Sequence, residues 1–352
     1  MRISLIVPVY NAEKHLPDLF ASITYQTRPF DEIILVDNNS HDSSLELCEN
    51  FRAKNSQKAV LTSRERIPGP GAARNRGINM AKGDILCFTD ADCVLEKDFA
   101  GNVESFFMEN GSIDILSGVA LSENPLREKD DLSLVEEFSL LFWSGERTSG
   151  QSFPLNSKSG FFSDSPFYIT TFNMACRRRV IEELKGFAED VMTMEDIDFW
   201  LRACDKGFLS EAGVPNIKVF HNNRKSLSSL THQHYSYMHS LPWILKKHFP
   251  GRFVFAYRMR KLFSFSLFTG LLEINPHTIL LALIIVKFSW LPFFLAVLIL
   301  YRVVAMARFL SKISAPSVSR SFAFGFIMEL RHLAMTCGAI AGSIRHKALC
   351  IL

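Results

Sequence analysis

The chain has 352 residues, and 39 Lys and Arg against 36 Asp and Glu give it a formal net charge of only +3. This small excess comes without an arginine-rich run, which excludes the charge pattern of a nucleic-acid-binding protein, so we expect no nucleic-acid partner. The seven cysteines form no CxxC pair, which argues against a zinc site or a disulfide framework and fits reduced thiols in a cytosol-facing domain.

The first part of the chain alternates between two patterns. Short apolar runs predict strands buried on both faces of a parallel sheet, at residues 3–9, 32–36 and 84–88. Helical segments are expected in the crossovers, at residues 14–26, 43–53 and 72–81. This order predicts a doubly wound α/β fold, in which ligands bind beyond the carboxyl ends of the strands.

Acidic residues follow two of these predicted strands. Asp37 could accept hydrogen bonds from a nucleobase or a ribose, although an ordinary turn would also explain it. The pair Asp90 and Asp92 has a spacing that suits Mg²⁺ or Mn²⁺ held against a diphosphate. Taken alone, a pair with this spacing at a strand end is more often part of a turn or a helix cap.

A glycine-containing segment at residues 69–77 opens the third predicted helix. Its arginines, Arg74 among them, could receive phosphate oxygens at the start of that helix. The segment follows a third strand and has Arg74 where a dinucleotide fingerprint needs its last glycine, which disfavours a nicotinamide enzyme.

Residues 195–202 have the pattern of a helix whose first turn is acidic. Capping alone would account for Glu195 and Asp196. A buried acid beside a metal-bound diphosphate would also make a good general base.

The C-terminal part is rich in Leu, Ile, Phe and Ala. Residues 278–301 are long enough to cross a bilayer as one span, or to form a helical hairpin broken near Lys287 and Pro292. The apolar segments 262–274 and 322–344 contain charges and could instead lie in the membrane interface, so one to three spans are open. A soluble helical subdomain is the alternative.

Several motifs occur together in one order, and this order resembles family 2 glycosyltransferases. They are Val7-Pro-Val-Tyr-Asn, Ser22-Ile-Thr-Tyr-Gln-Thr, Glu32-Ile-Ile-Leu-Val-Asp-Asn-Asn-Ser, Ala73-Arg-Asn-Arg-Gly, Gly83-Asp, Asp90-Ala-Asp and Glu195-Asp-Ile-Asp-Phe-Trp-Leu-Arg. The resemblance covers roughly residues 1–225. It implies the GT-A fold, a Rossmann-like, mostly parallel sheet, and inversion of configuration at the sugar carbon.

The resemblance assigns the donor side of the site. The nucleotide would be bound by Pro8, Tyr10, Asp37 and Arg74. Asp90 would contact the ribose or the metal, and Asp92 would bind the metal.

It also assigns the catalytic side. Asp196 would be the catalytic base, and Glu195 would position the acceptor or the base. Arg202 would hold the acidic helix or the phosphate. His221 resembles a histidine near the diphosphate and the metal, although a lone histidine is often structural.

Two departures from the family pattern narrow the expectation. Asn38 stands where a second acid is often found, so nucleobase recognition would rest on Asp37. The chain has no QxxRW motif after the acidic helix, which favours transfer of a single sugar over processive synthesis.

We therefore expect three regions: a GT-A catalytic domain at 1–225, a basic and aromatic juxtamembrane linker at 226–261, and hydrophobic membrane-associated helices at 262–352. The expected enzyme is a membrane-bound hexosyltransferase (EC 2.4) with a cytosolic catalytic domain. It would use Mg²⁺ or Mn²⁺ to transfer sugar from a nucleotide-sugar to a lipid-linked or envelope glycan acceptor. The alternatives are a polyprenyl-phosphate sugar synthase, a sugar nucleotidyltransferase and a catalytically silent nucleotide-sugar binding module.

Overall fold

The computed structural model describes residues 1–55, 59–121, 133, 135, 152–154, 169–222, 226–249 and 318–346. The predicted membrane segments at 262–274 and 278–301 lie outside these residues. The chain forms two compact units, Met1–Asp131 with Trp143–Asn223, and Leu132–Phe142 with Arg224–Leu352.

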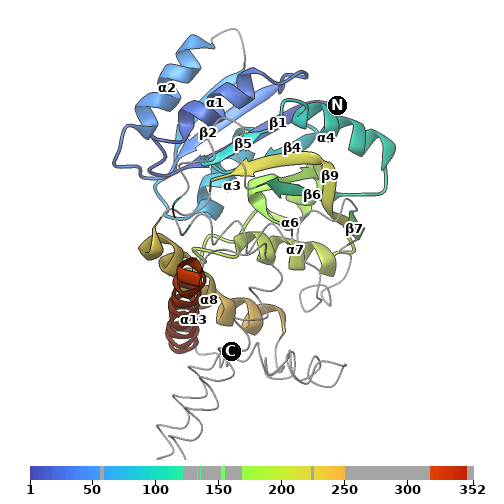
Figure 1. Cartoon of the computed structure of the whole chain (residues 1–352). Helices are drawn as coiled ribbons and strands as arrows, with labels where there is room; N and C mark the ends of the chain where they lie inside the picture. The colour runs from blue at the N-terminus through green and yellow to red at the C-terminus, as the bar shows by residue number, and fades with distance from the viewer. Residues whose placement is uncertain are drawn as a thin grey trace, which may run out of the picture. The chain divides into compact units, whose positions relative to one another are not determined.

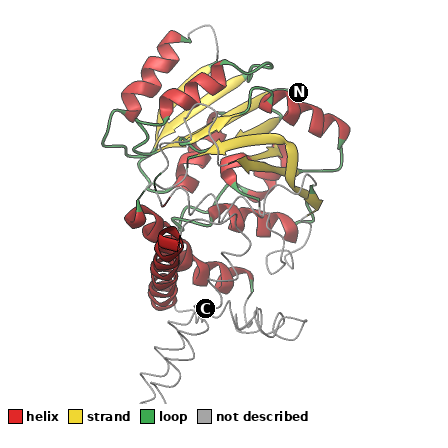
Figure 2. Ribbon diagram, viewed as in Figure 1, coloured by secondary structure: helices red, strands yellow, loops and turns green. Residues whose placement is uncertain are grey.

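The first unit contains a mixed sheet whose described strands run in the order β3-β2-β1-β4-β8-β6-β9-β5, with β7 paired to β9 (Figures 1 and 2). Four consecutive members are parallel: β3 (Val60–Arg64), β2 (Glu32–Asp37), β1 (Ile3–Val9) and β4 (Ile85–Phe88). The three strands predicted from the apolar runs are therefore confirmed. Nearly all their side chains are buried, as expected for a sheet covered on both faces.

The other half of the sheet contains antiparallel pairs. β8 (Met174–Arg177) runs antiparallel to β4 and to β6 (Ile115–Leu121), and β9 (Ser210–His221) runs parallel to β6. The short strands β5 (Cys93–Leu95) and β7 (Phe153–Pro154) pair antiparallel with β9. This arrangement returns the end of β9 to the segment that follows β4.

Pro8 lies in the central strand β1, at a position where its missing N–H costs no hydrogen bond of the sheet. The pairing of β1 with β4 ends at Ile6 and Phe88, and the Ile6 carbonyl accepts from the Thr89 amide. Two residues later, the missing N–H of Pro8 faces the same side, beyond the end of β4. β1 and β4 therefore separate at this point without losing a hydrogen bond. A ligand can approach the ends of these two strands here.

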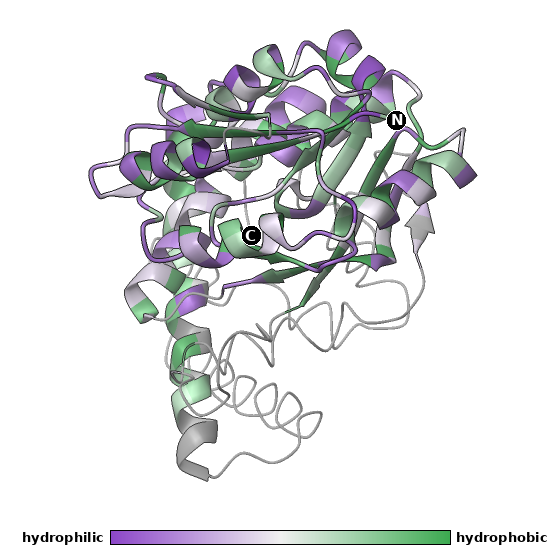
Figure 3. Cartoon of the chain, turned by 90° about the horizontal axis from the view of Figure 1, so that it is seen from above, coloured by the Kyte–Doolittle hydropathy of each residue, from purple (hydrophilic) through white to green (hydrophobic). Residues whose placement is uncertain are grey.

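Helices cover both faces of the sheet. The odd-numbered side chains of β1 pack in one core with residues of α1 (Leu16–Thr24), α2 (Ser44–Lys54) and α4 (Phe99–Glu109). On the other face, Gly77 of α3 (Pro70–Met80) approaches Ile6, Ile34 and Val36. The hydropathy colouring in Figure 3 shows the strands as the most hydrophobic part of this unit. The predicted helices at 14–26, 43–53 and 72–81 are confirmed.

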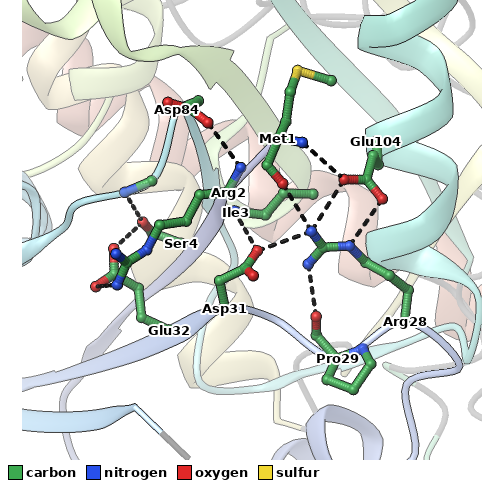
Figure 4. A network of polar contacts seen from close by, with 11 residues as sticks. Met1, Arg2, Ile3, Ser4, Arg28, Pro29, Asp31, Glu32, Asp84 and Glu104 are labelled. Atoms are coloured by element: carbon green, nitrogen blue, oxygen red, sulfur yellow. Dashed lines mark hydrogen bonds and ion pairs between the residues drawn. The ribbon is translucent and has the colours of Figure 1, made fainter.

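A polar network closes the amino end of β1 (Figure 4). Arg28 pairs with Asp31 at 2.9 Å and with Glu104 at 3.0 Å, and the Asp31 carboxylate accepts from the Ile3 amide at 2.7 Å. Glu32 accepts from the Ser4 hydroxyl at 2.5 Å. These contacts lie at the amino ends of the strands, and the candidate site lies at the opposite, carboxyl ends.

The described part of the second unit consists mainly of α8 (Leu227–His248) and α13 (Val318–His346). Leu230, Phe324 and Ile327 form a small core with Val135. Arg331 donates to Nε2 of His234 at 3.0 Å, and burial together with the arginine charge lowers the pKa of His234 to about 3. Among the described residues, no helix is both long and apolar enough to cross a membrane.

The close approach of α3 to the segment before α7 gives a test of this packing. A Cβ on Gly71 would lie 2.2 Å from the Ala188 carbonyl oxygen. Gly71→Ala should therefore lower the free energy of unfolding by about 1–3 kcal/mol, the usual cost of overpacking. Urea denaturation would measure this change.

Gly101→Ala is the matched control, because the new Cβ would lie 3.6 Å from Arg28 Cβ, an ordinary contact. It should change stability by less than about 1 kcal/mol. Equal losses in the two variants would contradict the packing described for Gly71.

Candidate active site

The site lies at the carboxyl ends of the parallel strands. The β1–β2 register pairs Val9 with Asp37, and the segment containing Asp90 and Asp92 begins two residues after β4 ends. Pro8 is partly buried in β1, and Tyr10, just beyond it, is 60% exposed. The fold therefore brings the residues that the sequence assigned to the donor to the carboxyl ends of the strands.

Asp37 is buried, with a side chain only 1% exposed. Neither carboxylate oxygen accepts a hydrogen bond from a residue that the structure describes, and the nearest cation is Arg64 Nε at 3.6 Å from Oδ2. A buried carboxylate normally has donors, because leaving it without them is costly. Its two oxygens can therefore accept N–H or O–H groups from a bound base or sugar.

The contacts of Asn38 explain why an amide stands where the family often has a second acid. Its Nδ2 donates to the carbonyls of Glu65 at 3.0 Å and Ile67 at 2.7 Å, and its Oδ1 accepts from the Gly69 amide at 2.8 Å. A carboxylate cannot donate these two bonds. Asn38 thus holds the loop between β3 and α3 against the end of β2, beside Asp37.

Arg74 joins two distant parts of the site. Its guanidinium is 2% exposed and lies 2.7 Å from the Asp90 carboxylate and 2.5 Å from that of Glu195. It also stacks over the Phe187 ring, 5.8 Å from the centroid. Sequence reasoning assigned Arg74 to the nucleotide, and the structure adds two carboxylate partners that sequence reasoning missed.

Asp92 and His221 meet because β5 and β9 pair in antiparallel register, with Cys93 opposite His221. His221 Nε2 lies 3.6 Å from Asp92 Oδ1. Asn222 fixes this contact, since its backbone N–H and its Nδ2 donate to the Asp92 carbonyl at 3.1 Å and 2.8 Å. The side chain of Asn222 was not predicted, and its position directly after His221 was the available signal.

This cluster can hold a divalent cation. The ligand atoms of Asp92, Cys93 and His221 lie within 4.8 Å of one another. Burial raises the pKa of the Cys93 thiol well above its ordinary value, so the sulfur is protonated in the metal-free protein. The remaining oxygen and nitrogen donors suit Mg²⁺ or Mn²⁺ better than a thiolate-bound metal.

Asp196 lies in the first turn of α7 (Glu195–Asp205), the helix predicted from the acidic pattern. Its Oδ1 accepts from the Ile197 amide at 2.8 Å and its Oδ2 from the Thr171 amide at 3.4 Å. Burial and the neighbouring Glu195 charge raise the pKa of Asp196 to about 7, against the opposing effects of Arg74 and these amides. A carboxyl group that ionises near neutrality can take a proton from a hydroxyl group.

Arg202 holds α7 in place. It donates to Asp198 at 2.8 Å and to the carbonyls of Leu184 at 2.7 Å and Gly186 at 2.8 Å. Asp198, which sequence reasoning did not single out, is fully buried beneath it. These contacts favour the helix-holding role of Arg202 over the phosphate-binding role.

Comparison with known proteins adds to this geometry. The sequence profile described as Glycosyl transferase family 2 matches residues 4–184, just over half of the chain. A poly(ribitol-phosphate) beta-glucosyltransferase of Bacillus spizizenii is 32% identical over 145 residues, which are 39% of this chain and only 23% of that protein. An uncharacterised glycosyltransferase of Methanocaldococcus jannaschii is 26% identical over 304 residues, which are 80% of this chain and 92% of that protein.

The fold is also found in a solved structure. It is similar, with a TM-score of 0.56 and 15% identity, to the mannosyltransferase PcManGT of Pyrobaculum calidifontis in complex with GDP-Man and Mn²⁺. The alignment covers 98% of this chain and 87% of that one. The mixed, mostly parallel sheet is thus of the GT-A type.

The raised pKa of Asp196 predicts a pH-dependent stability. Because the folded-state pKa is about 7 and the ordinary value is 3.8, the wild-type protein loses stability as pH rises through this window. Asp196→Asn removes the ionising group. It should therefore unfold like the wild type near pH 4 and be more stable by about 2–4 kcal/mol above pH 7.

Thermal and urea unfolding across this pH range would test the prediction. Asp205→Asn, a change of the same kind at the exposed end of α7, is the control and should show no such trend. A difference between Asp196→Asn and wild type that does not vary with pH would contradict the raised pKa.

Proposed function

Because the chain belongs to glycosyl transferase family 2 and is therefore a glycosyltransferase, we propose that it transfers a single sugar, with inversion, from a nucleotide-diphospho-sugar to a lipid-linked or envelope glycan acceptor. The reaction depends on Mg²⁺ or Mn²⁺ and takes place at the cytosolic face of a membrane. The observation that carries this proposal is the bridge of Asp90, Arg74 and Glu195, which places the Asp90–Asp92 loop next to the helix that bears Asp196.

The donor occupies the strand ends. Asp37 accepts hydrogen bonds from the base, and Pro8 and Tyr10 border the base and the ribose. Asp92 and His221 hold the cation, which when bound offsets the charge of the leaving diphosphate. Asp90 keeps its carboxylate paired with Arg74, so it contributes chiefly by orienting the loop and contacting the ribose.

The transfer is a single displacement. Asp196 takes the proton of the acceptor hydroxyl, whose oxygen forms a bond to the anomeric carbon. The bond from that carbon to the diphosphate oxygen breaks, and the diphosphate leaves with the electron pair. Attack opposite the leaving group inverts the configuration, and no covalent enzyme intermediate is needed.

The acceptor class rests on two supports. The Bacillus relative is named for transfer to poly(ribitol-phosphate) with a beta product, so a polyol or glycan hydroxyl is a suitable acceptor chemistry. The apolar stretch 278–301, outside the described residues, is long enough to span a bilayer and supports membrane attachment. A polyprenyl phosphate is the alternative acceptor. The absence of a QxxRW motif supports transfer of one sugar per encounter.

The metal cluster gives a test of donor binding. Asp92→Asn and His221→Ala should each weaken binding of a nucleoside diphosphate in the presence of Mn²⁺ by about tenfold or more, since the first removes the carboxylate charge and the second removes the imidazole. Calorimetry with UDP and GDP, before and after chelation, would measure the effect.

Cys93→Ala is the matched control from the same cluster, and it should leave metal-dependent binding unchanged because Mg²⁺ and Mn²⁺ prefer oxygen and nitrogen ligands to sulfur. Loss of binding in all three variants would place the sulfur among the ligands. Binding that ignores metal in the wild-type protein would remove the roles assigned to Asp92 and His221.

A second test separates catalysis from binding. Asp196→Asn should lower turnover by about 10²–10⁴-fold while leaving the affinity for the donor nucleotide within about twofold, because it removes only proton transfer. Wild-type turnover should rise with pH toward a plateau above about 7, following ionisation of Asp196.

The readouts are radiolabelled sugar transfer and NMR of the product anomer. Unchanged turnover in Asp196→Asn would remove the role of base from this residue. Retention of the donor's anomeric configuration would contradict the single displacement. Release of pyrophosphate from a nucleoside triphosphate and a sugar 1-phosphate, with no sugar transfer from the nucleotide-sugar, would favour a nucleotidyltransferase.

A further inference from the structure

The packing of α13 against α8 fixes which side of α13 faces inward. A Cβ on Gly338 would lie 2.2 Å from the Tyr235 carbonyl oxygen, and a Cβ on Gly342 would lie 2.1 Å from that of His239. Only glycine permits the two backbones to approach this closely. Both glycines are buried, and their spacing of four residues places them on one side of the helix.

The opposite side of α13 is apolar and exposed. Phe326 is 61% exposed, Leu333 45%, Ile340 39% and Ile344 75%. Together with half-buried Leu330 and exposed Cys337 they recur at alternating intervals of four and three residues: Phe326, Leu330, Leu333, Cys337, Ile340 and Ile344. We call these six residues the outer face of α13. At about 100° per residue they form one stripe along the helix, turned away from the glycines.

Basic residues gather at the C-terminal end of this stripe. Lys246 and Lys247 end α8, and Lys246 Nζ donates to the His346 carbonyl at 3.0 Å, which brings it beside exposed Arg345. Lys247 lies 4.3 Å from the centre of the Trp243 ring. A tryptophan with lysines and an arginine next to an apolar stripe is the residue set that proteins place at the lipid headgroup level.

We propose that the outer face of α13 lies in the headgroup region of an anionic bilayer, with its helix axis in the membrane plane and Lys246, Lys247 and Arg345 against the lipid phosphates. This inference rests on the membrane location included in the proposed function and specifies which surface makes the contact. Because the glycine side of α13 packs on α8, the outer face is the side of this helix that remains for a lipid surface.

A lipid surface fits this face better than a second copy of the chain. Two copies packed in parallel along the stripe would bring their Lys246, Lys247 and Arg345 clusters together, and like charges repel. An anionic bilayer instead complements these charges. The 69 residues between α8 and α13, numbered 249–317, include the apolar stretch 278–301, so a bilayer would already lie close to both helices.

Cys337 provides a direct probe, because it is exposed near the middle of the outer face. In full-length protein carrying Cys204→Ser and Cys350→Ser, an environment-sensitive fluorophore on Cys337 would be followed during reconstitution into vesicles. The vesicles contain phosphatidylcholine with an equal share of phosphatidylglycerol. The proposal expects a blue-shifted emission that lipids bearing a nitroxide on the acyl chain quench strongly.

Two variants and a control separate the contributions. Leu333→Gln with Ile340→Gln should reduce the quenching several-fold by weakening apolar contact. Lys246→Gln with Lys247→Gln should reduce it in the anionic vesicles only. The same fluorophore at Met108→Cys, on a Cys337→Ser background, reports from an exposed apolar position of α4 and should remain water-like.

The outcomes distinguish the occupant. A blue shift without quenching by lipid nitroxides, accompanied by a concentration-dependent change of mass in detergent, would show a second copy on this face and overturn the proposal. A water-like signal at Cys337 in all vesicles would overturn it as well. Sugar transfer to a detergent-dispersed acceptor, measured on the same samples, tests the proposed function separately, since none of the changed residues belongs to the active site.

Discussion

The rest of the site depends on the ion pairs that the buried Arg74 makes with two carboxylates. Arg74 pairs with Asp90, after β4, and with Glu195, at the start of α7, two positions that are far apart in the sequence. A buried guanidinium needs its charge paired, and here Asp90 and Glu195 do this and accept from its two terminal nitrogens, while Nε has no acceptor among the described residues. Neither carboxylate can be removed without leaving a buried charge less well paired. The loop that presents Asp92 and the helix that presents Asp196 are therefore held together as one unit.

Much of the parallel half of the fold was accessible from sequence, because each buried strand is a local apolar run and each crossover helix has its own periodicity. The same locality made Asp37, Asp90 and the start of α7 predictable. What the sequence did not show depends on long-range pairing. The partners of Arg74, the three bonds made by Asn38 and the burial of Asp198 under Arg202 are set by segments that meet only after folding.

His221 illustrates the limit most clearly. Its resemblance to a family histidine named it, but its distance from Asp92 follows from the antiparallel pairing of β5 with β9, which no local pattern indicates. The strand β5 is only three residues long, and its side chains are buried by neighbours from elsewhere in the chain. The sequence thus named Asp92 and His221 as candidate ligands, and the sheet topology brings the two side chains together.

The charges around Arg74 also determine the pH at which Asp196 ionises. Asp90, Arg74 and Glu195 together carry one negative charge, and ionisation of Asp196 raises this to two. Burial makes the second charge costly, which is why the pKa of Asp196 lies near 7. The Arg74 charge acts in the opposite direction and, with the two backbone amides, keeps that pKa from rising further. The guanidinium that joins the two segments therefore also keeps Asp196 ionisable near neutral pH, where it can accept a proton from a hydroxyl group.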